Sequence, residues 1–437
     1  MDFGYASPLE GSRMRQLNTA GKPTHVAWAI AVCCAIGALE GYDIQAVGVS
    51  APAMAPALHM PEAFIGYASS LTMAGLILGA VVGGWAADRF GRKPVLVASA
   101  ALFGVFTVLT ALVQTSNELF VLRTLTGLGL GGAMPNMIAM GAEISAPERR
   151  SATITGIFSG FPAGGAVASL LTLAVLAGVL PKSFDWRLVY LVGGALAIAL
   201  VPVALMTLPE TRPARTGERR NVLTVLFGEG RAAPTLLLCL AFACTTVLLY
   251  LMVGWLPTLV VGEGLSRVDA ALAALSFNVT STAGGVAIGI AVDRFGLRRA
   301  ALASYIGLVL AMGALAATSA FAAILVFAGL AGFFAVGAQF ALYAASPTYY
   351  PPSARALGVG AAVGAGRVGS IIGPTLGGVL RAAHASSNQV LLATLPVILM
   401  GGVAAVALTF VGRAAHETEP DGGGDRDAGA EAELRML

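Results

Sequence analysis

Four charged side chains lie in stretches of the chain that are otherwise apolar. Glu40 and Asp43 are three residues apart, so they share one face of a helix. Arg123 and Arg367 lie in two further apolar runs. A charge within a membrane span is costly, about 2.5 kcal/mol or more for Asp at the helix centre, so such groups face a cavity and commonly bind ions or transfer protons. The pattern therefore predicts an internal site of carboxylates and guanidinium groups.

The composition places these groups in a membrane protein. Charged residues make up 11% of the 437 residues, against about 25% in a soluble domain, and apolar residues reach 57%. This excludes a soluble globular protein, because too few charged side chains are available for a water-facing surface. The 55 glycines follow no three-residue period, which excludes a collagen-like chain. The four cysteines lie in apolar runs, which argues against disulfides.

Apolar stretches of roughly 20 residues, long enough to cross a bilayer, recur along the chain. We predict twelve membrane helices, near residues 25–55, 63–87, 94–114, 118–143, 152–178, 187–208, 233–260, 269–292, 300–319, 321–346, 356–380 and 389–412. With a cytoplasmic N-terminus, 20 of the 26 Lys and Arg residues fall in inside segments and four in outside loops. The positive-inside rule then predicts a multi-pass protein of a bacterial cytoplasmic membrane with both termini in the cytoplasm.

Polar segments divide the chain into parts. The longest polar connection between spans holds five arginines and predicts a linker between two groups of six helices. The last 22 residues are too polar to pack and predict a disordered tail. The expected parts are an N-terminal segment at 1–24, a six-helix bundle at 25–208, a linker at 209–232, a second bundle at 233–413 and a cytoplasmic tail at 414–437.

The two groups of helices are repeats of one another. A shift of 205 residues lays Gly84–Gly91 over Gly289–Gly296, close to residue for residue. The same shift takes Pro52 to Pro257, Gly127 to Gly332 and Arg150 to Arg355. Parallel repeats of six spans are typical of transporters whose site lies between two rocking bundles. We therefore predict an all-α integral membrane protein with twelve transmembrane helices in two pseudo-symmetric six-helix bundles.

Motifs in both repeats carry a family resemblance. The loop motif Gly84-x3-Asp88-Arg89-Phe90-Gly91-Arg92-Lys93 resembles the signature of the major facilitator superfamily, and Asp293-Arg294-Phe295-Gly296 is similar to its second copy, with Leu297 replacing a basic residue. Glu40-Gly41-Tyr42-Asp43 and Arg123–Gly131 are similar to aromatic acid:proton symporters, most of all the 3-(3-hydroxyphenyl)propionate transporter type. Many of these relatives have Asp where this chain has Glu40. The resemblance implies import of an aromatic carboxylate with protons by alternating access.

The residues and the resemblance together predict a proton-coupling unit. Glu40, Asp43 and Arg123 are expected at a similar depth in the outer half of the membrane. Burial favours a neutral carboxylic acid whereas Arg123 favours the anion, so protonation of Asp43 can change with hydration and with the distance to Arg123. We favour Asp43 over Glu40 as the proton carrier because the resemblance points there. The alternative is a permanent ion pair that only fixes helix packing.

Arg367 is the predicted anchor for a substrate carboxylate. It is expected about 18 Å from the cytoplasmic end of its helix, near the midplane, where substrates bind in such folds. Its planar guanidinium can hold a carboxylate through two hydrogen bonds. Alternatively it pairs with Glu40 or Asp43 in the empty protein, and substrate could displace that pair. Asn278 could bind a ring hydroxyl or another helix, and four rings could enclose the substrate or only pack: Phe158, Phe161, Phe333 and Phe334.

The charged loop motifs predict a gate on the cytoplasmic side. Asp88 lies near the C-terminal end of its helix, where the helix dipole disfavours an anion, so it requires a positive partner. In the superfamily this loop is a gate, and the resemblance implies that charged contacts close the cytoplasmic side in the outward-open state. The gate residues are then Asp88, Arg89, Gly91, Arg92, Asp293 and Arg294. The alternative is a charge cluster that only sets the topology.

Other classes of function receive little support. The glycine pattern at 127–132 follows no strand, which excludes a dinucleotide fold. The four histidines are scattered and no catalytic set is evident, so we expect no metal, no cofactor, no nucleic-acid partner and no enzymatic activity. A monomer is expected. The remaining alternatives are a proton-coupled exporter of amphipathic compounds, disfavoured because Arg367 suits an anion, and a non-transporting sensor of aromatic acids.

Overall fold

The computed structural model describes residues 23–146, 149–180, 185–211, 222–228, 230–350 and 355–417. The N-terminal segment to residue 22, most of the linker and the tail from residue 418 lie outside them. All regular elements in these residues are helical. The first half holds α2 (Pro23–Ala57), α3 (Ala63–Phe90), α4 (Arg92–Thr110), α5 (Ser116–Ile144), α6 (Arg150–Leu176) and α7 (Arg187–Thr207). The second holds α9 (Ala232–Gly262), α10 (Arg267–Phe295), α11 (Leu297–Ala316), α12 (Phe321–Ala345), η3 (Ser346–Tyr349), α13 (Arg355–Ala382), α14 (Ser387–Leu392) and α15 (Leu395–Glu417).

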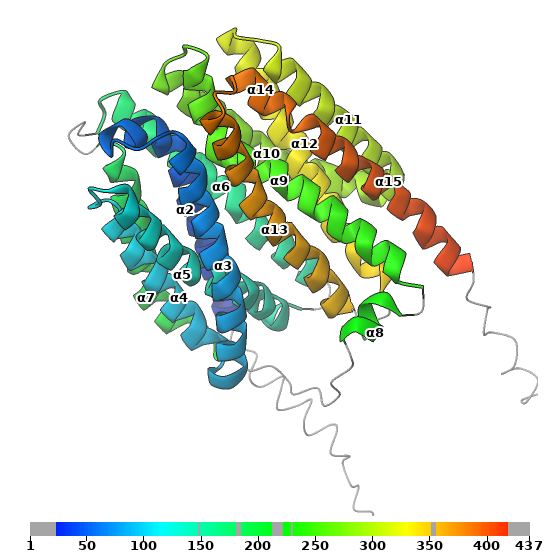
Figure 1. Cartoon of the computed structure of the whole chain (residues 1–437). Helices are drawn as coiled ribbons and strands as arrows, with labels where there is room; N and C mark the ends of the chain where they lie inside the picture. Colours follow the sequence, from blue (N-terminus) through cyan, green and yellow to red (C-terminus); the bar gives the residue numbers. More distant parts are fainter. Residues whose placement is uncertain are drawn as a thin grey trace, which may run out of the picture.

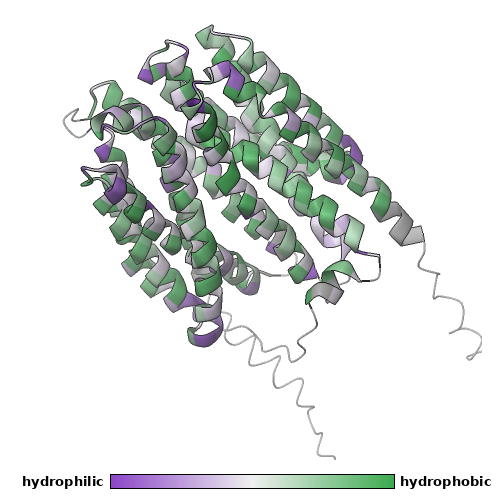
Figure 2. Cartoon of the chain, in the orientation of Figure 1, coloured by the Kyte–Doolittle hydropathy of each residue, from purple (hydrophilic) through white to green (hydrophobic). Residues whose placement is uncertain are grey.

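The long helices account for the twelve predicted spans. Ten spans within the described residues are long and apolar enough to cross a membrane, with α14 and α15 together forming one of them. The other two spans are α5 and α13, whose hydropathy is lowered by Arg123 and Arg367 and by many glycines. Apolar residues cover most of the length of the long helices (Figure 2). The prediction of an all-helical membrane protein is confirmed.

The predicted linker contains a short helix that its polar composition did not indicate. This helix, α8 (Val222–Phe227), lies next to the start of α9. The Thr235 hydroxyl of α9 donates a hydrogen bond of 2.8 Å to the Leu226 carbonyl oxygen. Leu226 is also buried, so an apolar side chain anchors this part of the connection to the second half.

The helices form two groups that lie side by side, α2–α7 in blue to teal and α9–α15 in green to red (Figure 1). In the two halves α3 and α10 end at equivalent positions, Phe90 and Phe295. The next residues, Gly91 and Gly296, have φ angles of 99° and 80°, which glycine adopts without steric cost. We call the side of the molecule where these helices end the Gly91 face, and the opposite side, where α3 begins, the Glu62 face.

Helix contacts also repeat at the 205-residue shift. A Cβ atom on Gly79 of α3 would overlap the carbonyl oxygen of Leu128 on α5, and one on Gly284 of α10 would overlap that of Phe333 on α12. Small residues thus let these helix backbones approach closely, which is how membrane helices pack without a hydrophobic driving force. The sequence repeat is therefore a repeat of specific packing contacts.

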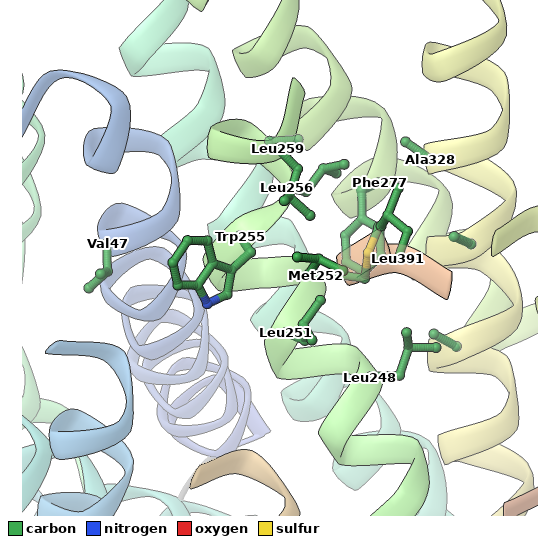
Figure 3. Packing of buried hydrophobic residues seen from close by; sticks show 14 of the residues in the cluster. Val47, Leu248, Leu251, Met252, Trp255, Leu256, Leu259, Phe277, Ala328 and Leu391 are labelled. Atoms are coloured by element: carbon green, nitrogen blue, oxygen red, sulfur yellow. The ribbon is translucent and has the colours of Figure 1, made fainter. Parts of the chain in front are cut away.

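The two halves meet along three helix pairs, α3 with α13, α6 with α10 and α2 with α9. Trp255 of α9 extends toward Val47 of α2, while Leu251 and Met252 pack on the other sides of the same helix (Figure 3). The Trp255 indole Nε1 donates a hydrogen bond of 3.0 Å to the Pro374 carbonyl oxygen of α13. This interface lies beside the residues that line the central cavity described next.

Candidate transport site

A cavity of about 890 Å³ lies between the two halves. Its wall is formed by residues of α2, α5 and α6 from the first half and of α9, α10, α12 and α13 from the second. Aromatic side chains dominate the wall: Phe158, Phe161, Tyr250, Phe277, Phe340 and Tyr343. A flat aromatic molecule suits such a lining because offset or edge-to-face ring contacts are favourable.

Arg367 provides the positive charge in the wall of this cavity. It lies on α13, is partly exposed to the cavity, and contacts the Sδ atom of Met134 across the space between the halves. It also interacts electrostatically with Glu40, Tyr250 and Tyr343. The predicted position of Arg367 at the centre of the molecule is thus observed, and its guanidinium faces a volume that can hold a carboxylate.

Glu40 is a buried carboxylate without a hydrogen-bond partner. Its side chain has no exposed surface, and neither Oε1 nor Oε2 accepts a hydrogen bond from the described residues. The positive charge that acts on it is Arg367, and Asp43 is the neighbouring negative charge. Arg367 lines the cavity and also interacts with Glu40, so its charge can neutralise either Glu40 or a bound anion.

Asp43 and Arg123 form the ion pair that the sequence predicts. Arg123 Nη1 and Nη2 donate hydrogen bonds of 3.1 and 2.5 Å to the two carboxylate oxygens of Asp43. The Thr107 hydroxyl donates a further bond of 2.7 Å to Asp43 Oδ1, and Arg123 Nε donates one of 3.2 Å to Thr72. Both charged side chains are buried, and the Tyr190 ring centroid lies 5.7 Å from the guanidinium carbon. All these groups belong to the first half.

Asn278 lines the cavity but is engaged by other protein groups. Its amide nitrogen donates a hydrogen bond of 3.0 Å to Gln45 Oε1 of the other half and one of 2.8 Å to the Ala274 carbonyl oxygen. The Gln45 amide in turn donates to the Val253 carbonyl oxygen at 3.4 Å. Of the two predicted roles for Asn278, contact with another helix is the one seen in this conformation.

The predicted aromatic residues separate into two groups. Phe158 and Phe161 line the cavity, as predicted, whereas Phe333 and Phe334 do not. Phe334 instead packs against Gly307 of α11 and is not part of the cavity wall in this conformation. The reason is helix geometry: the cavity face of α12 carries Val336, Gln339, Phe340 and Tyr343, at helical spacing, and Phe334 lies roughly 200° around the helix from Val336.

The cavity wall contains residues that sequence reasoning missed. Tyr250, Gln339, Phe340 and Tyr343 belong to no motif, and each lies in an almost uninterrupted apolar run. The one usable signal was polar spacing, because Gln339 and Tyr343 are four residues apart and share a helix face. A lone amide on an otherwise apolar membrane helix is itself an indication of an inward-facing position.

The predicted gate residues lie at the Gly91 face. Asp88 and Asp293 are exposed, and neither forms an ion pair with another described residue. Arg89 and Arg294 each stack on an aromatic ring of their own helix, at 5.7 Å from the Phe90 centroid and 5.4 Å from the Phe295 centroid. In this conformation these charged side chains therefore do not join the two halves.

Arg92, also a predicted gate residue, is held within the first half. Its Nη2 atom lies 2.7 Å from Glu143 Oε1, and its backbone nitrogen donates a hydrogen bond of 3.1 Å to the Thr211 carbonyl oxygen. The neighbouring Gly91 packs against the Glu210 side chain. The motif thus connects α4 to the ends of α5 and α7.

The halves are joined by polar contacts on the other side of the molecule, at and below the Glu62 face. Arg381 forms an ion pair with Glu62 at 2.6 Å, and Arg267 forms one with Asp185 at 3.3 Å. Deeper in the interface, the Ser70 hydroxyl donates a hydrogen bond of 2.9 Å to the Ile371 carbonyl oxygen. The Glu62 face is thus the closed side of the cavity in this conformation.

Two repeated six-helix groups with a charged cavity between them are typical of one class of protein. This class is the membrane transporters in which two helix bundles rock about a central site. The sequence profile described as "Major Facilitator Superfamily" matches residues 33–290 and 264–434. The chain belongs to this superfamily. The predictions of a multi-pass membrane transporter, and of a transporter rather than an enzyme, are confirmed by this membership.

Several characterised relatives are similar over most of the chain. The 3-(3-hydroxyphenyl)propionate transporter of Escherichia coli strain K12 is 35% identical over 87% of this chain and 93% of the relative. The 4-hydroxybenzoate transporter PcaK of Pseudomonas aeruginosa is 32% identical over 89% and 93%, and the gallate transporter of Pseudomonas putida is 34% identical over 80% and 85%.

Solved structures share the fold at low sequence identity. A bacterial homologue of the human lysosomal transporter Spinster, in an inward-facing and unoccupied conformation, matches with a TM-score of 0.72 at 16% identity over 91% of this chain and 99% of that chain. A D-xylose–proton symporter matches with a TM-score of 0.70 at 18% identity over 89% and 97%. The arrangement of helices described above is thus that of known transporters.

Proposed function

We propose that this protein imports an aromatic carboxylate together with protons by alternating access. The observation that carries the proposal is Arg367 in the wall of an aromatic-lined cavity between the two halves. A guanidinium suits a carboxylate through two parallel hydrogen bonds, and the surrounding rings suit an aromatic body. The relatives described above support this substrate class, since they are transporters of 3-(3-hydroxyphenyl)propionate, 4-hydroxybenzoate and gallate. The preferred substrate is 3-(3-hydroxyphenyl)propionate or a related hydroxylated or benzoate-type acid.

The substrate carboxylate and Glu40 compete for Arg367, and this competition links substrate binding to the charge on Glu40. Without substrate the guanidinium is balanced by Glu40, whose carboxylate oxygens accept no hydrogen bond from the described residues. A substrate carboxylate bound at Arg367 neutralises the guanidinium in place of Glu40. An ionised Glu40 beside it is then an uncompensated buried charge. Substrate binding is therefore most favourable when Glu40 is protonated.

Asp43, Glu40 and Arg123 form the proposed proton-coupling unit, with Asp43 as the proton carrier. In this conformation both carboxylate oxygens of Asp43 accept hydrogen bonds from Arg123, and Oδ1 accepts a further one from Thr107. To take up a proton it must separate from Arg123, and rocking of the helices that carry the two residues supplies such a change. A proton on Asp43 would then accompany the conversion between the two access states.

Topology and gating complete the proposal. The distribution of Lys and Arg assigns the Gly91 face to the cytoplasm of a bacterial inner membrane. The conformation seen here is then inward-facing, and charged contacts among the gate residues form when the Gly91 face closes. The bundles at 25–208 and 233–413 move as units about the central cavity, and a monomer is sufficient.

Uptake into proteoliposomes tests this function. Radiolabelled 3-(3-hydroxyphenyl)propionate is expected to accumulate when an inward proton gradient is imposed, and benzoate, 4-hydroxybenzoate and vanillate are expected to compete. Dissipating the gradient with an ionophore should reduce accumulation to simple equilibration. If none of the acids enters or competes while a reconstituted control transporter works, the assignment is wrong. Transport of amphipathic cations in counterflow would then favour an exporter.

Closure of the Glu62 face should be blocked by a bulky residue at Gly66. A Cβ atom there would overlap the Pro374 carbonyl oxygen of the other half and lie 3.2 Å from Gly378 Cα. Gly66→Leu is therefore expected to hold this face open and reduce uptake at least about 10-fold. Gly84→Leu on the same helix is the matched control, since a Cβ at Gly84 meets nothing within 4 Å.

Cysteine labelling reports the trapped state directly. A cysteine introduced at Ser69, which is buried near the interface, should react faster with an impermeant maleimide added outside when Gly66→Leu is present. Normal uptake and unchanged labelling of Gly66→Leu would contradict the closed assignment of the Glu62 face.

A further inference from the structure

Most polar side chains in the cavity wall already have partners within the protein. Hydroxyl groups of α9, α10 and α13 donate to backbone carbonyl oxygens, and the Asn278 amide binds Gln45. The Ser281 and Ser370 bonds lie within one helix, whereas the Thr246 and Asn278 bonds join two helices, and in both cases the donor is already used and offers little to a ligand. Among the residues that line the cavity, Gln339 is different, because its Oε1 atom is buried and accepts no hydrogen bond from the part of the chain that the structure describes.

Gln339 is placed so that this oxygen can act on a molecule bound in the cavity. Its side chain is 6% exposed and lies on the face of α12 that also carries Phe340 and Tyr343. The Gln339 amide nitrogen donates to the Tyr343 hydroxyl oxygen, which leaves Oε1 unpaired, and Tyr343 also interacts electrostatically with Arg367. Tyr343 therefore interacts with both Arg367 and Gln339, so the cation and the unpaired acceptor lie at the same part of the cavity.

A buried carbonyl oxygen without a donor is unfavourable, and a ligand that supplies a donor relieves this cost. The cavity wall is therefore complementary to a molecule with three features. These are an anionic group that pairs with Arg367, an aromatic body that contacts the rings, and a neutral hydrogen-bond donor for Gln339. A phenolic hydroxyl on the aromatic ring is such a donor.

We propose that Gln339 determines specificity by accepting a hydrogen bond from the phenolic hydroxyl of the transported acid. The carrier then prefers ring-hydroxylated acids over the same acids without the hydroxyl. This inference rests on the proposed function, in which Arg367 binds the carboxylate. An analogue without the donor leaves Gln339 unpaired, and a site built to bind a substrate hydroxyl rejects such an analogue, here by roughly 10-fold or more.

Three acids that differ at one ring position test the inference. We would compare 3-(3-hydroxyphenyl)propionate, 3-phenylpropionate and 3-(3-methoxyphenyl)propionate by kcat/KM for uptake into proteoliposomes. The methoxy compound retains an oxygen acceptor but has no proton to donate. The parent protein is expected to prefer the hydroxylated acid at least about 10-fold over both analogues. A parent ratio near one would overturn the inference without any variant.

Gln339→Leu is expected to bring the ratio between the hydroxylated acid and 3-phenylpropionate to about one, because the unpaired acceptor is gone. Gln339→Asn keeps the amide but moves it away from the cavity because its side chain is shorter, so a ratio between those of the parent and Gln339→Leu is expected. It also provides a second variant if Gln339→Leu does not fold. Ser281→Ala is the matched control, since that hydroxyl lines the cavity but donates to the Phe277 carbonyl oxygen. It should keep the parent ratio.

The outcomes separate this inference from the proposed function. Uptake of both acids by Gln339→Leu with the parent ratio intact would overturn the role of Gln339 and leave the transport of aromatic acids standing. Failure of the folded parent protein to take up any of the three acids would overturn the proposed function, and the role of Gln339 with it.

Discussion

Replacing Arg367 with Met is expected to reduce kcat/KM for every aromatic acid at least about 100-fold. Removing one partner of a buried charge pair costs 2–5 kcal/mol, and about 1.4 kcal/mol corresponds to a factor of ten. Met keeps an unbranched apolar chain in place of the arginine stem, so the change removes the guanidinium charge while part of the packing is retained. Arg367→Lys keeps the charge but not the planar fork, and a loss of about 10-fold is expected. Initial uptake rates and calorimetric binding of the acids measure both effects.

Two comparisons make the Arg367 result specific. Arg298→Met removes a guanidinium that stacks 4.6 Å from the Phe410 ring centroid, outside the cavity, and should leave uptake unchanged. The uncharged 3-phenylpropanamide should bind Arg367→Met and the parent equally weakly, because it has no carboxylate to lose. Calorimetric binding of the acids by Arg367→Met with parent affinity would show that the carboxylate is held elsewhere.

The features that were predictable from sequence depend on large, local free-energy terms. Span positions follow from hydropathy, and the 205-residue repeat places Gly79 and Gly284 in equivalent helix contacts. The Asp43–Arg123 pair was predictable because an isolated charge inside a membrane is so costly that opposite charges at one depth are expected to meet. These terms do not require knowledge of how distant helices are rotated.

The features that were missed depend on helix rotation and on contacts between the halves. In a soluble helix the polar side marks the outside, but α12 is apolar apart from Gln339 and Tyr343, so its inward face could be inferred only from these two residues and not from an apolar stripe. Phe334 was for this reason placed in the cavity, whereas Gln339 and Tyr343 line it. The engagement of Asn278 by Gln45 required the packing of α10 against α2, 233 residues apart.

Asp43→Asn is expected to abolish accumulation driven by a proton gradient while counterflow of labelled for unlabelled acid continues. An amide occupies the same volume as the carboxylate but cannot bind or release a proton, so the coupled step is lost and substrate binding is kept. The change also leaves Arg123 as an uncompensated buried charge, at a cost of about 3–5 kcal/mol. The variant Asp43→Asn/Arg123→Gln removes both charges and should recover stability without recovering accumulation. Thermal unfolding and uptake measure the two effects separately.

Glu40→Gln, one turn away on the same helix, distinguishes the two carboxylates. Glu40 competes with the substrate for Arg367, so its neutral form should bind the acid at least as tightly as the parent does, and should retain part of the accumulation. Asp43 does not touch the cavity, so Asp43→Asn should leave affinity almost unchanged while accumulation is lost. Full accumulation by Asp43→Asn together with none by Glu40→Gln would reverse these roles. The proton carrier would then be the unpaired carboxylate, and the Asp43–Arg123 pair would serve only to hold α2 against α5.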